Sequence, residues 1–222
     1  MNGTFAIFQI LAFLGALALV VGLTLGATVA GAMGKRDLAL KAAAADLIVL
    51  SGYAIVWVLA GVLSSDRVLA RGEEKHFCEI DCHVANSVTG VTRADSVDGI
   101  KPAGTFYLVT VRTWFDPTTT SPSRPKDAVV YPNPRVIYLV DAGGRRFAPS
   151  EAGMAALQKR GEGGTPITQP LLPDASYTTT FAFDAPANLP NLRLWLANDD
   201  VGSALLIGSE RSPMHGKVLF AL

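Results

Sequence analysis

The chain has 222 residues, of which 50% are hydrophobic, and its 19 basic and 19 acidic side chains cancel. A net charge of zero provides no basic patch for nucleic acid, so a nucleic-acid partner is not expected. The mean hydropathy of +0.32 is high for a soluble domain, and the apolar excess lies before residue 64. The two cysteines are too few for a disulfide-based scaffold.

Two apolar runs predict a pair of membrane helices within residues 1–65. They cover about residues 4–33 and 42–63, and the first contains no charged side chain. About 20 apolar residues span a bilayer core, so each run is long enough. Asp46 stands near the start of the second run, where a helix N-terminus favours negative charge. We therefore interpret it as an interfacial carboxylate, with a buried functional carboxylate as the alternative.

A secretory signal peptide is the competing interpretation of the first run. Ala30-Gly31-Ala32 has the small residues of a cleavage site. However, no Lys or Arg precedes the run, and the run is about twice as long as a normal signal-peptide core. These features favour a retained membrane helix.

Basic residues predict the orientation of the hairpin. Lys35, Arg36 and Lys41 lie between or beside the two runs, whereas the N-terminal tail has no basic side chain. The positive-inside rule then places the connection in the cytoplasm and both chain ends outside, in a bacterial inner membrane with a periplasmic C-terminal domain. Arg67, Arg71 and Lys75 follow the second run, but long domains translocate largely regardless of such charges.

Small residues recur along the first run as Gly22-xxx-Gly26 and Ala27-xxx-Gly31. This pattern allows helices to approach closely. The simpler interpretation is packing within the hairpin, and the alternative is packing against another membrane subunit. Two helices enclose no pore by themselves, so a transporter is not indicated.

After a linker at 66–76, residues 77–222 are expected to form an all-β, immunoglobulin-like antiparallel sandwich. Short runs rich in β-branched and aromatic residues are separated by turn residues, and no strand–helix–strand alternation is present. The expected strands are 83–91, 106–115, 136–140, 145–147, 177–183, 192–197, 204–207 and 218–222, with one short helix at 151–160.

A resemblance to a known family rests on four segments in succession, which are 106–115, 139–147, 172–176 and 181–186. They include a D-x-x-G turn (141–144) and an F-D-x-P strand end (183–186). It resembles bacterial extracytoplasmic telokin-like, immunoglobulin-like domains of unknown function, often found behind a membrane anchor. The likeness covers about residues 76–222. Its motifs are structural, so it implies the fold and no activity.

The peptide His76-Phe-Cys-Glu-Ile-Asp-Cys82-His83 holds both cysteines and two of the three histidines. In an extended strand Cys78 and Cys82 would lie about 13 Å apart, beyond disulfide reach, whereas a helical turn brings them to about 6 Å. Three interpretations remain open. The first is a Cys78–Cys82 disulfide, the default for nearby cysteines in an oxidising compartment. The second is a copper or zinc site. The third is a lengthened haem c attachment motif.

The candidate metal ligands are Cys78, Cys82 and His83, with His215, and Met214 beside it, folding back from the C-terminal region. The layout of two helices followed by an outer β domain is similar to cytochrome oxidase subunit II, whose copper site also uses a C-x-x-x-C pair. This sequence departs from that pattern, because Asn86 and Thr89 stand where that family has His and Met. A copper site of that particular type is therefore not expected.

No nucleophile elbow and no phosphate-binding loop occurs in the sequence. The leading hypothesis is a non-enzymatic accessory subunit of a larger membrane complex, whose outer domain contacts other integral membrane subunits. A respiratory or photosynthetic electron-transport assembly is the host that the architectural analogy suggests. The alternative is an extracytoplasmic copper or zinc protein that transfers electrons.

Overall fold

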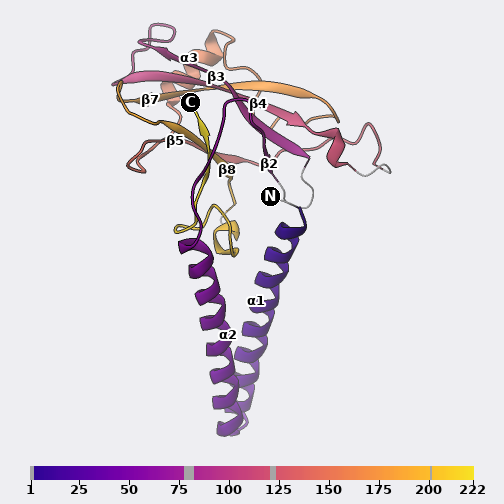
Figure 1. Ribbon diagram of the computed structural model, residues 1–222. Helices are drawn as coiled ribbons and strands as arrows, with labels where there is room; N and C mark the ends of the chain where they lie inside the picture. Colours follow the sequence, from indigo (N-terminus) through magenta and orange to yellow (C-terminus); the bar gives the residue numbers. More distant parts are fainter. Residues whose placement is uncertain (1–2, 78–82, 121–123, 201) are drawn as a thin grey trace. The chain divides into compact units, whose positions relative to one another are not determined.

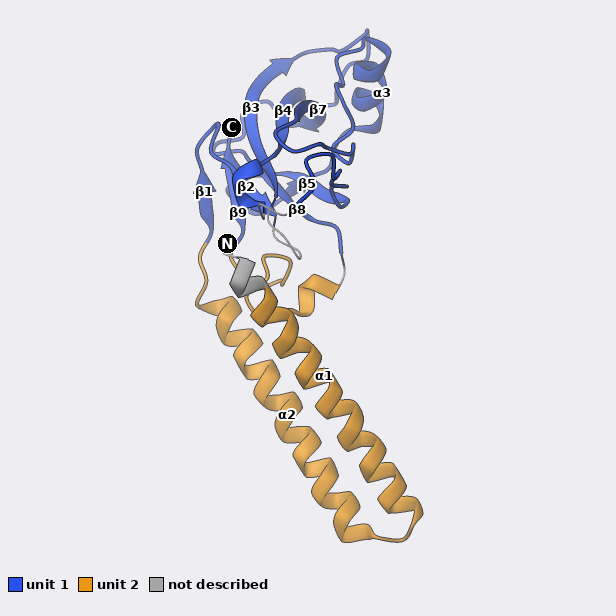
Figure 2. Ribbon diagram, turned by 90° about the vertical axis from the view of Figure 1, so that its right-hand side faces the viewer, with its two compact units in different colours: residues 1, 66–200, 217–222 blue, residues 2–65, 201–216 orange. Residues whose placement is uncertain are grey.

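The structure is a computed structural model that describes residues 3–77, 83–120, 124–200 and 202–222. The chain divides into two compact units, drawn in different colours in Figure 2. The helical unit contains residues up to 65 together with 202–216, and the sandwich unit contains 66–200 and 217–222.

Two long helices, α1 (Gly3–Ala32) and α2 (Arg36–Val62), run side by side in opposite directions (Figure 1). Both are long and apolar enough to cross a membrane. Along α1 the less exposed residues are spaced by three and four, as expected for one face that packs on a neighbouring helix. They are Gln9, Phe13, Ala16, Val20, Leu23, Ala27 and Ala30.

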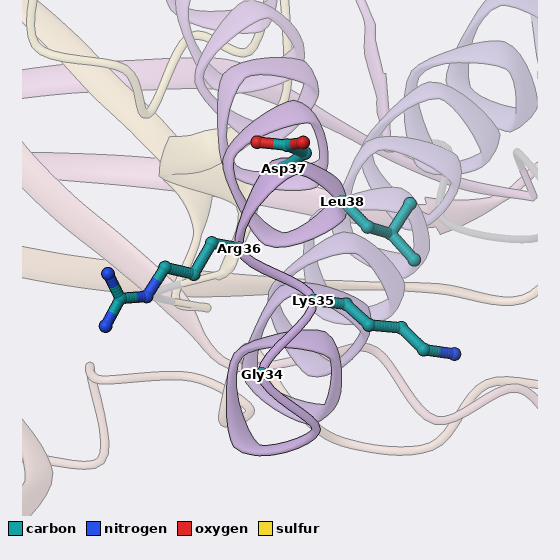
Figure 3. A pocket seen from close by; sticks show the side chains of 5 residues that line it. All are labelled: Gly34, Lys35, Arg36, Asp37 and Leu38. Atoms are coloured by element: carbon teal, nitrogen blue, oxygen red, sulfur yellow. The ribbon is translucent and has the colours of Figure 1, made fainter.

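Gly34 ends α1 and lets α2 begin at once. Its φ of 73° is a left-handed conformation that favours glycine. The Lys35 amide donates to the Ala30 carbonyl (2.8 Å) and the Gly34 amide to the Gly31 carbonyl (3.0 Å). This pair of bonds is a Schellman motif, which satisfies carbonyls at the helix end. Figure 3 shows the Lys35 and Arg36 side chains at this turn, pointing to different sides.

The second helix therefore begins at Arg36 rather than at residue 42. The polar residues 36–41 are compatible with a helix, and Asp37 lies in its first turn, where negative charge is favourable. Asp46 consequently lies about three turns inside α2. The interpretation of Asp46 as a carboxylate at the helix start was wrong, because hydropathy marks the apolar run and not the helix boundary.

The sandwich unit consists of two sheets. One sheet has five strands in the order β1 (Arg67–Leu69), β9 (Val218–Ala221), β8 (Arg193–Asn198), β5 (Arg135–Val140) and β6 (Arg146–Phe147). The other has four, in the order β2 (Lys75–Phe77), β3 (Val84–Ala94), β4 (Thr105–Phe115) and β7 (Ser176–Ala185). Every pairing is antiparallel except β1 with β9. The predicted β-sandwich is confirmed.

Alternate residues of the long strands fill the space between the sheets, as period-2 strands require. Val109, Val111 and Phe183 from one sheet and Leu139, Leu194, Leu196 and Phe220 from the other are fully buried in one core cluster. On the other face of the five-stranded sheet, Tyr138, Trp195 and Leu219 are register neighbours on β5, β8 and β9. The Tyr138 and Trp195 rings stack with centroids 6.0 Å apart.

The predicted short helix is α3 (Glu151–Lys159). Ser150 caps it by accepting a hydrogen bond from the Gly153 amide (3.2 Å). The helix lies so close to the four-stranded sheet that a Cβ on Gly153 would come within 2.8 Å of the Ala182 Cβ and 2.9 Å of the Phe106 ring. Glycine at this position is therefore required by the close approach of α3 to β4 and β7.

Two other expectations differ from the structure. Residues 66–76, expected to be a linker, contain β1 and β2, which pair with β9 and β3. Residues 204–207, expected to be a strand, lie at a 3-10 helix, η2 (Gly202–Leu205). The carbonyls of Ala204 and Leu205 accept hydrogen bonds from side chains of α2. These contacts, which hydropathy alone does not reveal, occupy backbone groups that a strand would use for a ladder.

Candidate functional site

A cluster of polar side chains in the sandwich lies at the two ends of the cysteine-containing peptide. β2 ends at Phe77 and β3 begins at Val84, and these two residues are the last pair of the antiparallel β2–β3 ladder. Cys78 and Cys82 lie outside the described residues. The disulfide, metal and haem interpretations of this pair therefore stay predictions. The flanking residues His76 and His83 are described.

Both histidines contact one turn, which follows β4 and contains the 3-10 helix η1 (Pro117–Thr119). His76 Nε2 lies 3.1 Å from Asp116 Oδ2, and His83 Nδ1 lies 2.6 Å from Thr119 Oγ1. The Asp116 amide also donates to the His83 carbonyl oxygen (2.8 Å). The turn 116–119, named here the histidine turn, thus holds both ends of the peptide.

Asp116 is the centre of the histidine turn. Its Oδ1 accepts hydrogen bonds from the Thr118 amide (2.9 Å) and the Thr118 hydroxyl (2.6 Å), while Oδ2 meets His76. Only 10% of its side chain is exposed. Burial raises the pKa of Asp116, but the hydrogen bonds from Thr118 and His76 outweigh it and hold the pKa below its ordinary value of 3.8. The carboxylate is therefore ionised at neutral pH.

The Thr119 hydroxyl lies within hydrogen-bond distance of both His83 Nδ1 and the Asp116 carbonyl oxygen. The Thr119 hydroxyl donates to the Asp116 carbonyl oxygen (2.8 Å), and a hydroxyl has only one proton to give. When the Thr119 proton goes to that carbonyl oxygen, Nδ1–H of His83 is the donor of the Thr119–His83 bond. In the neutral ring Nε2 then carries the lone pair, the arrangement found when imidazole ligates a metal through that nitrogen. The ring stacks on Phe115 with centroids 5.3 Å apart, and His83 is 5% exposed.

The remaining predicted ligands are in the other unit. Met214 and His215 belong to the helical unit, and His215 Nδ1 lies 2.7 Å from the Gly216 carbonyl oxygen. Within the described ranges, no group of three or more His, Cys, Asp or Glu side chains is placed to hold a metal ion. Of the five predicted site residues, the structure thus describes three and assigns them to two separate units.

Asp116 and Thr119 were not predicted as site residues from the sequence. The signal available was Asp followed by Pro, Thr and Thr, because Asp in such a position accepts hydrogen bonds from backbone two residues ahead. Nothing in the sequence, however, connects this turn with histidines more than thirty residues earlier. The β3–β4 pairing of Val84 with Phe115 makes that connection.

A second candidate site is the small-residue face of α1. A Cβ placed on Gly15, Gly22, Gly26 or Gly31 would meet no described atom within 4 Å. Ala27, by contrast, lies on the half-buried face toward α2. The expectation of packing within the hairpin was therefore wrong for Gly15, Gly22 and Gly26, because at about 100° per residue they lie on the side of α1 opposite its half-buried residues. Their side of the helix has room for the backbone of another helix.

Comparisons with known proteins add three distant solved structures. No family model matches the sequence, and no curated protein matches it. The secreted protein MPT63 of Mycobacterium tuberculosis is 12% identical, with 71% of this chain and 98% of that chain covered and a TM-score of 0.44. The yjhA protein of Bacillus subtilis is 16% identical, with 69% and 98% covered and a TM-score of 0.40. At these TM-scores the likenesses carry no argument about family or activity.

Proposed function

We propose that this protein is a non-enzymatic accessory subunit of a larger membrane complex. The helix pair anchors it in a bacterial inner membrane, and the sandwich is the extracytoplasmic part that contacts partner subunits. A respiratory or photosynthetic electron-transport assembly is the proposed host. The observation that carries the proposal is the exposed face of Gly22 and Gly26 on a helix long enough to cross a membrane.

The physical reason is the packing of helices in lipid. Helix association in a bilayer has little hydrophobic driving force and depends on close van der Waals contact, which small residues permit. An isolated hairpin would have no use for an exposed glycine face. Leucine side chains at Gly22 and Gly26 would hold a partner helix away while leaving the α1–α2 contact in place, because these glycines do not contact α2.

The test is the size and composition of the complex purified from native membranes in mild detergent. We compare the wild type, the double variant Gly22→Leu with Gly26→Leu, and a control with Leu19→Ile and Leu25→Ile. Leu19 and Leu25 are 57% and 61% exposed on α1. Loss of about 1.4 kcal/mol of packing raises the dissociation constant of the complex about tenfold in the glycine variant. The control should keep the wild-type partners. A wild type that purifies as a lone monomer would contradict the proposal.

A second candidate function is copper or zinc binding by Cys78, Cys82 and His83 for electron transfer. The observation that favours it is the contact of His83 Nδ1 with Thr119 Oγ1, which in the Nδ1–H tautomer leaves the lone pair on Nε2. Thiolate sulfur and imidazole nitrogen are ligands that suit both metals. We expect stoichiometric metal in protein purified from native membranes, lost in Cys78→Ser and in His83→Asn.

His215→Asn is the matched control for this site. If that variant retains the metal, the ligands belong to the sandwich alone. If it loses the metal, His215, with Met214 beside it, belongs to the ligand set. The contrary outcome is protein with no metal and no titratable thiols before reduction, which would show a Cys78–Cys82 disulfide. That result would give the peptide a structural role in place of metal binding.

A further inference from the structure

The connection between β8 and β9 is far longer than their pairing requires. These strands are antiparallel neighbours, which a turn of two to about five residues can join. Instead the chain leaves the sandwich after residue 200 and returns at 217, and residues 202–216 belong to the helical unit (Figure 2). We call residues 202–216 the interfacial segment.

The interfacial segment lies along one face of α2. The Tyr53 hydroxyl donates to the Leu205 carbonyl (2.8 Å), and Trp57 Nε1 donates to the Ala204 carbonyl (3.2 Å). One turn further, a Cβ on Gly61 would lie 3.0 Å from the Met214 Cβ, so the two chains are in close contact there. The contact residues 53, 57 and 61 are four apart, the spacing of a single helix face.

Beyond the helix the contact continues. The Ser64 hydroxyl accepts a hydrogen bond from the Gly216 amide (2.7 Å) and donates to the Gly61 carbonyl (2.6 Å). Both ends of the interfacial segment are thus attached to the last turns of α2 and to the residues that follow it. The segment is a fixed part of the helical unit.

The depth of this contact follows from the length of α2. From Arg36, the basic residue that opens the helix, to Trp57 the rise is about 31 Å, close to the thickness of a bilayer core. Tyr and Trp are enriched where a membrane helix meets the headgroups. Tyr53 and Trp57 therefore mark the second boundary of the bilayer, and the segment hydrogen-bonded to them lies at that boundary.

The segment presents two apolar side chains that are about half exposed. Leu205 is 53% exposed and Met214 is 42% exposed. The charged side chains of the segment, Glu210 and Arg211, are of opposite sign, so it carries no net charge with His215 neutral. Apolar exposure without net charge fits the headgroup–acyl boundary of a neutral bilayer better than an electrostatic contact with anionic lipid.

We propose that the interfacial segment inserts Leu205 and Met214 into the outer boundary of the bilayer, so that it is a second membrane contact besides the two helices. The occupant of this surface is phospholipid, because the segment is continuous with the helix face that Tyr53 and Trp57 place at the membrane boundary. The inference rests on the membrane placement of α1 and α2 in the proposed function.

The test places a benzophenone amino acid at Leu205 in the full chain, reconstituted in phosphatidylcholine vesicles. The matched position is Ile48, which is 72% exposed and lies near the middle of α2. After irradiation, lipid adducts are identified by mass spectrometry, and fragmentation locates the attachment on the lipid. We expect adducts at both positions, on the glycerol or first acyl carbons for residue 205 and on the distal half of the acyl chain for residue 48.

Adducts at Ile48 but none at Leu205 would overturn the inference and leave the membrane placement intact. A crosslink from residue 205 to a second copy of the chain, in place of lipid, would also overturn it. Attachment of residue 205 to the distal half of the acyl chain would contradict the depth. The lack of lipid adducts at both positions would remove the membrane placement itself, and with it the proposed function.

Discussion

At the scale of single residues, Asp116 connects the two histidines of the cysteine-containing peptide to the end of β4. It accepts three hydrogen bonds, one from His76 and two from Thr118, and its side chain is nearly buried. Hydrogen bonds to a charged group contribute more than those between neutral groups. The stability of the sandwich is therefore expected to depend on the ionised form of Asp116.

We predict that Asp116→Asn lowers the free energy of unfolding of the sandwich by about 1.5 to 3 kcal/mol at pH 7. Because the folded pKa lies below its ordinary value of 3.8, the carboxylate contributes fully above that value, and its contribution is lost as the pH falls through the folded pKa. The difference between wild type and variant should therefore shrink below about pH 4. Denaturant unfolding in detergent at pH 7 and pH 3 measures it.

Asp98→Asn is the control for this prediction. Asp98 pairs with Lys159 at 2.6 Å, but the lysine side chain is 75% exposed, and such surface pairs contribute about 0 to 1 kcal/mol. An equal loss of stability in both variants, or a loss in Asp116→Asn that does not change with pH, would contradict a specific role for the ionised Asp116.

At the scale of elements, a side-chain hydrogen bond joins α1 to α2. The Thr24 hydroxyl donates to Asp46 Oδ2 (2.9 Å), and Asp46 Oδ1 is enclosed with no hydrogen-bond partner among the described residues. Asp46 is about ten residues from Arg36 and eleven from Trp57, which places it near the middle of the span of α2. In a bilayer an ionisable group at this position of the helix would be expensive, so its hydrogen bond to Thr24 would matter.

We predict that Thr24→Val weakens the association of α1 with α2 by about 0.6 to 2 kcal/mol, because interhelical hydrogen bonds in membranes have this magnitude. Thr24→Ser, which keeps the hydroxyl, should restore the wild-type value. Equilibrium unfolding of the hairpin in detergent mixtures, followed by energy transfer between labels on the two helices, measures the association.

Thr28→Val separates this effect from a general loss of helix stability. The Thr28 hydroxyl donates within its own helix, to the Thr24 carbonyl (2.8 Å), so its removal should leave the interhelical contact unchanged. Equal destabilisation by Thr24→Val and Thr28→Val would show that the Thr24–Asp46 bond contributes nothing beyond local helix stability.

At the scale of the whole molecule, the chain order and the compact units do not coincide. β1 starts directly after the helices and pairs with β9 at the C-terminal end of the chain, while residues 202–216 leave the sandwich to join the helical unit. Each unit is thus built from two segments that are separated in the sequence by a segment of the other unit. The proposed complex would involve both units. The exposed glycine face of the helical unit would contact a partner helix, and the sandwich would contact partner subunits outside the membrane.

Inside the sandwich, Lys75 shows why charge counts along the sequence can mislead. We counted it among the basic residues that follow the second apolar run. In the structure it is 8% exposed, and its Nζ donates to the carbonyls of Leu196 (2.5 Å) and Val218 (3.3 Å). These carbonyls lie where the β8–β9 ladder ends at the Trp195–Leu219 pair. A lysine of one sheet therefore stabilises strands of the other.

The sequence by itself determined the elements whose signals are local. Hydropathy predicted two long helices, alternation predicted most of the strands, and Asp141 with two glycines predicted the β5–β6 turn, where Asp141 Oδ1 accepts from the amides of Gly143 and Arg145 (2.9 Å each). These features depend on the properties of neighbouring residues, which the sequence states directly. Short strands such as β1 and β2 have too few residues to show a period.

Only the tertiary structure decided which distant residues meet. It brought His76 and His83 to the histidine turn, turned Gly22 and Gly26 away from α2, and placed residues 202–216 against Tyr53 and Trp57. Such contacts depend on strand register, on which side of a helix faces its neighbour, and on the route of a long connection. Those properties arise from the packing of the whole chain, and no local pattern of residues encodes them.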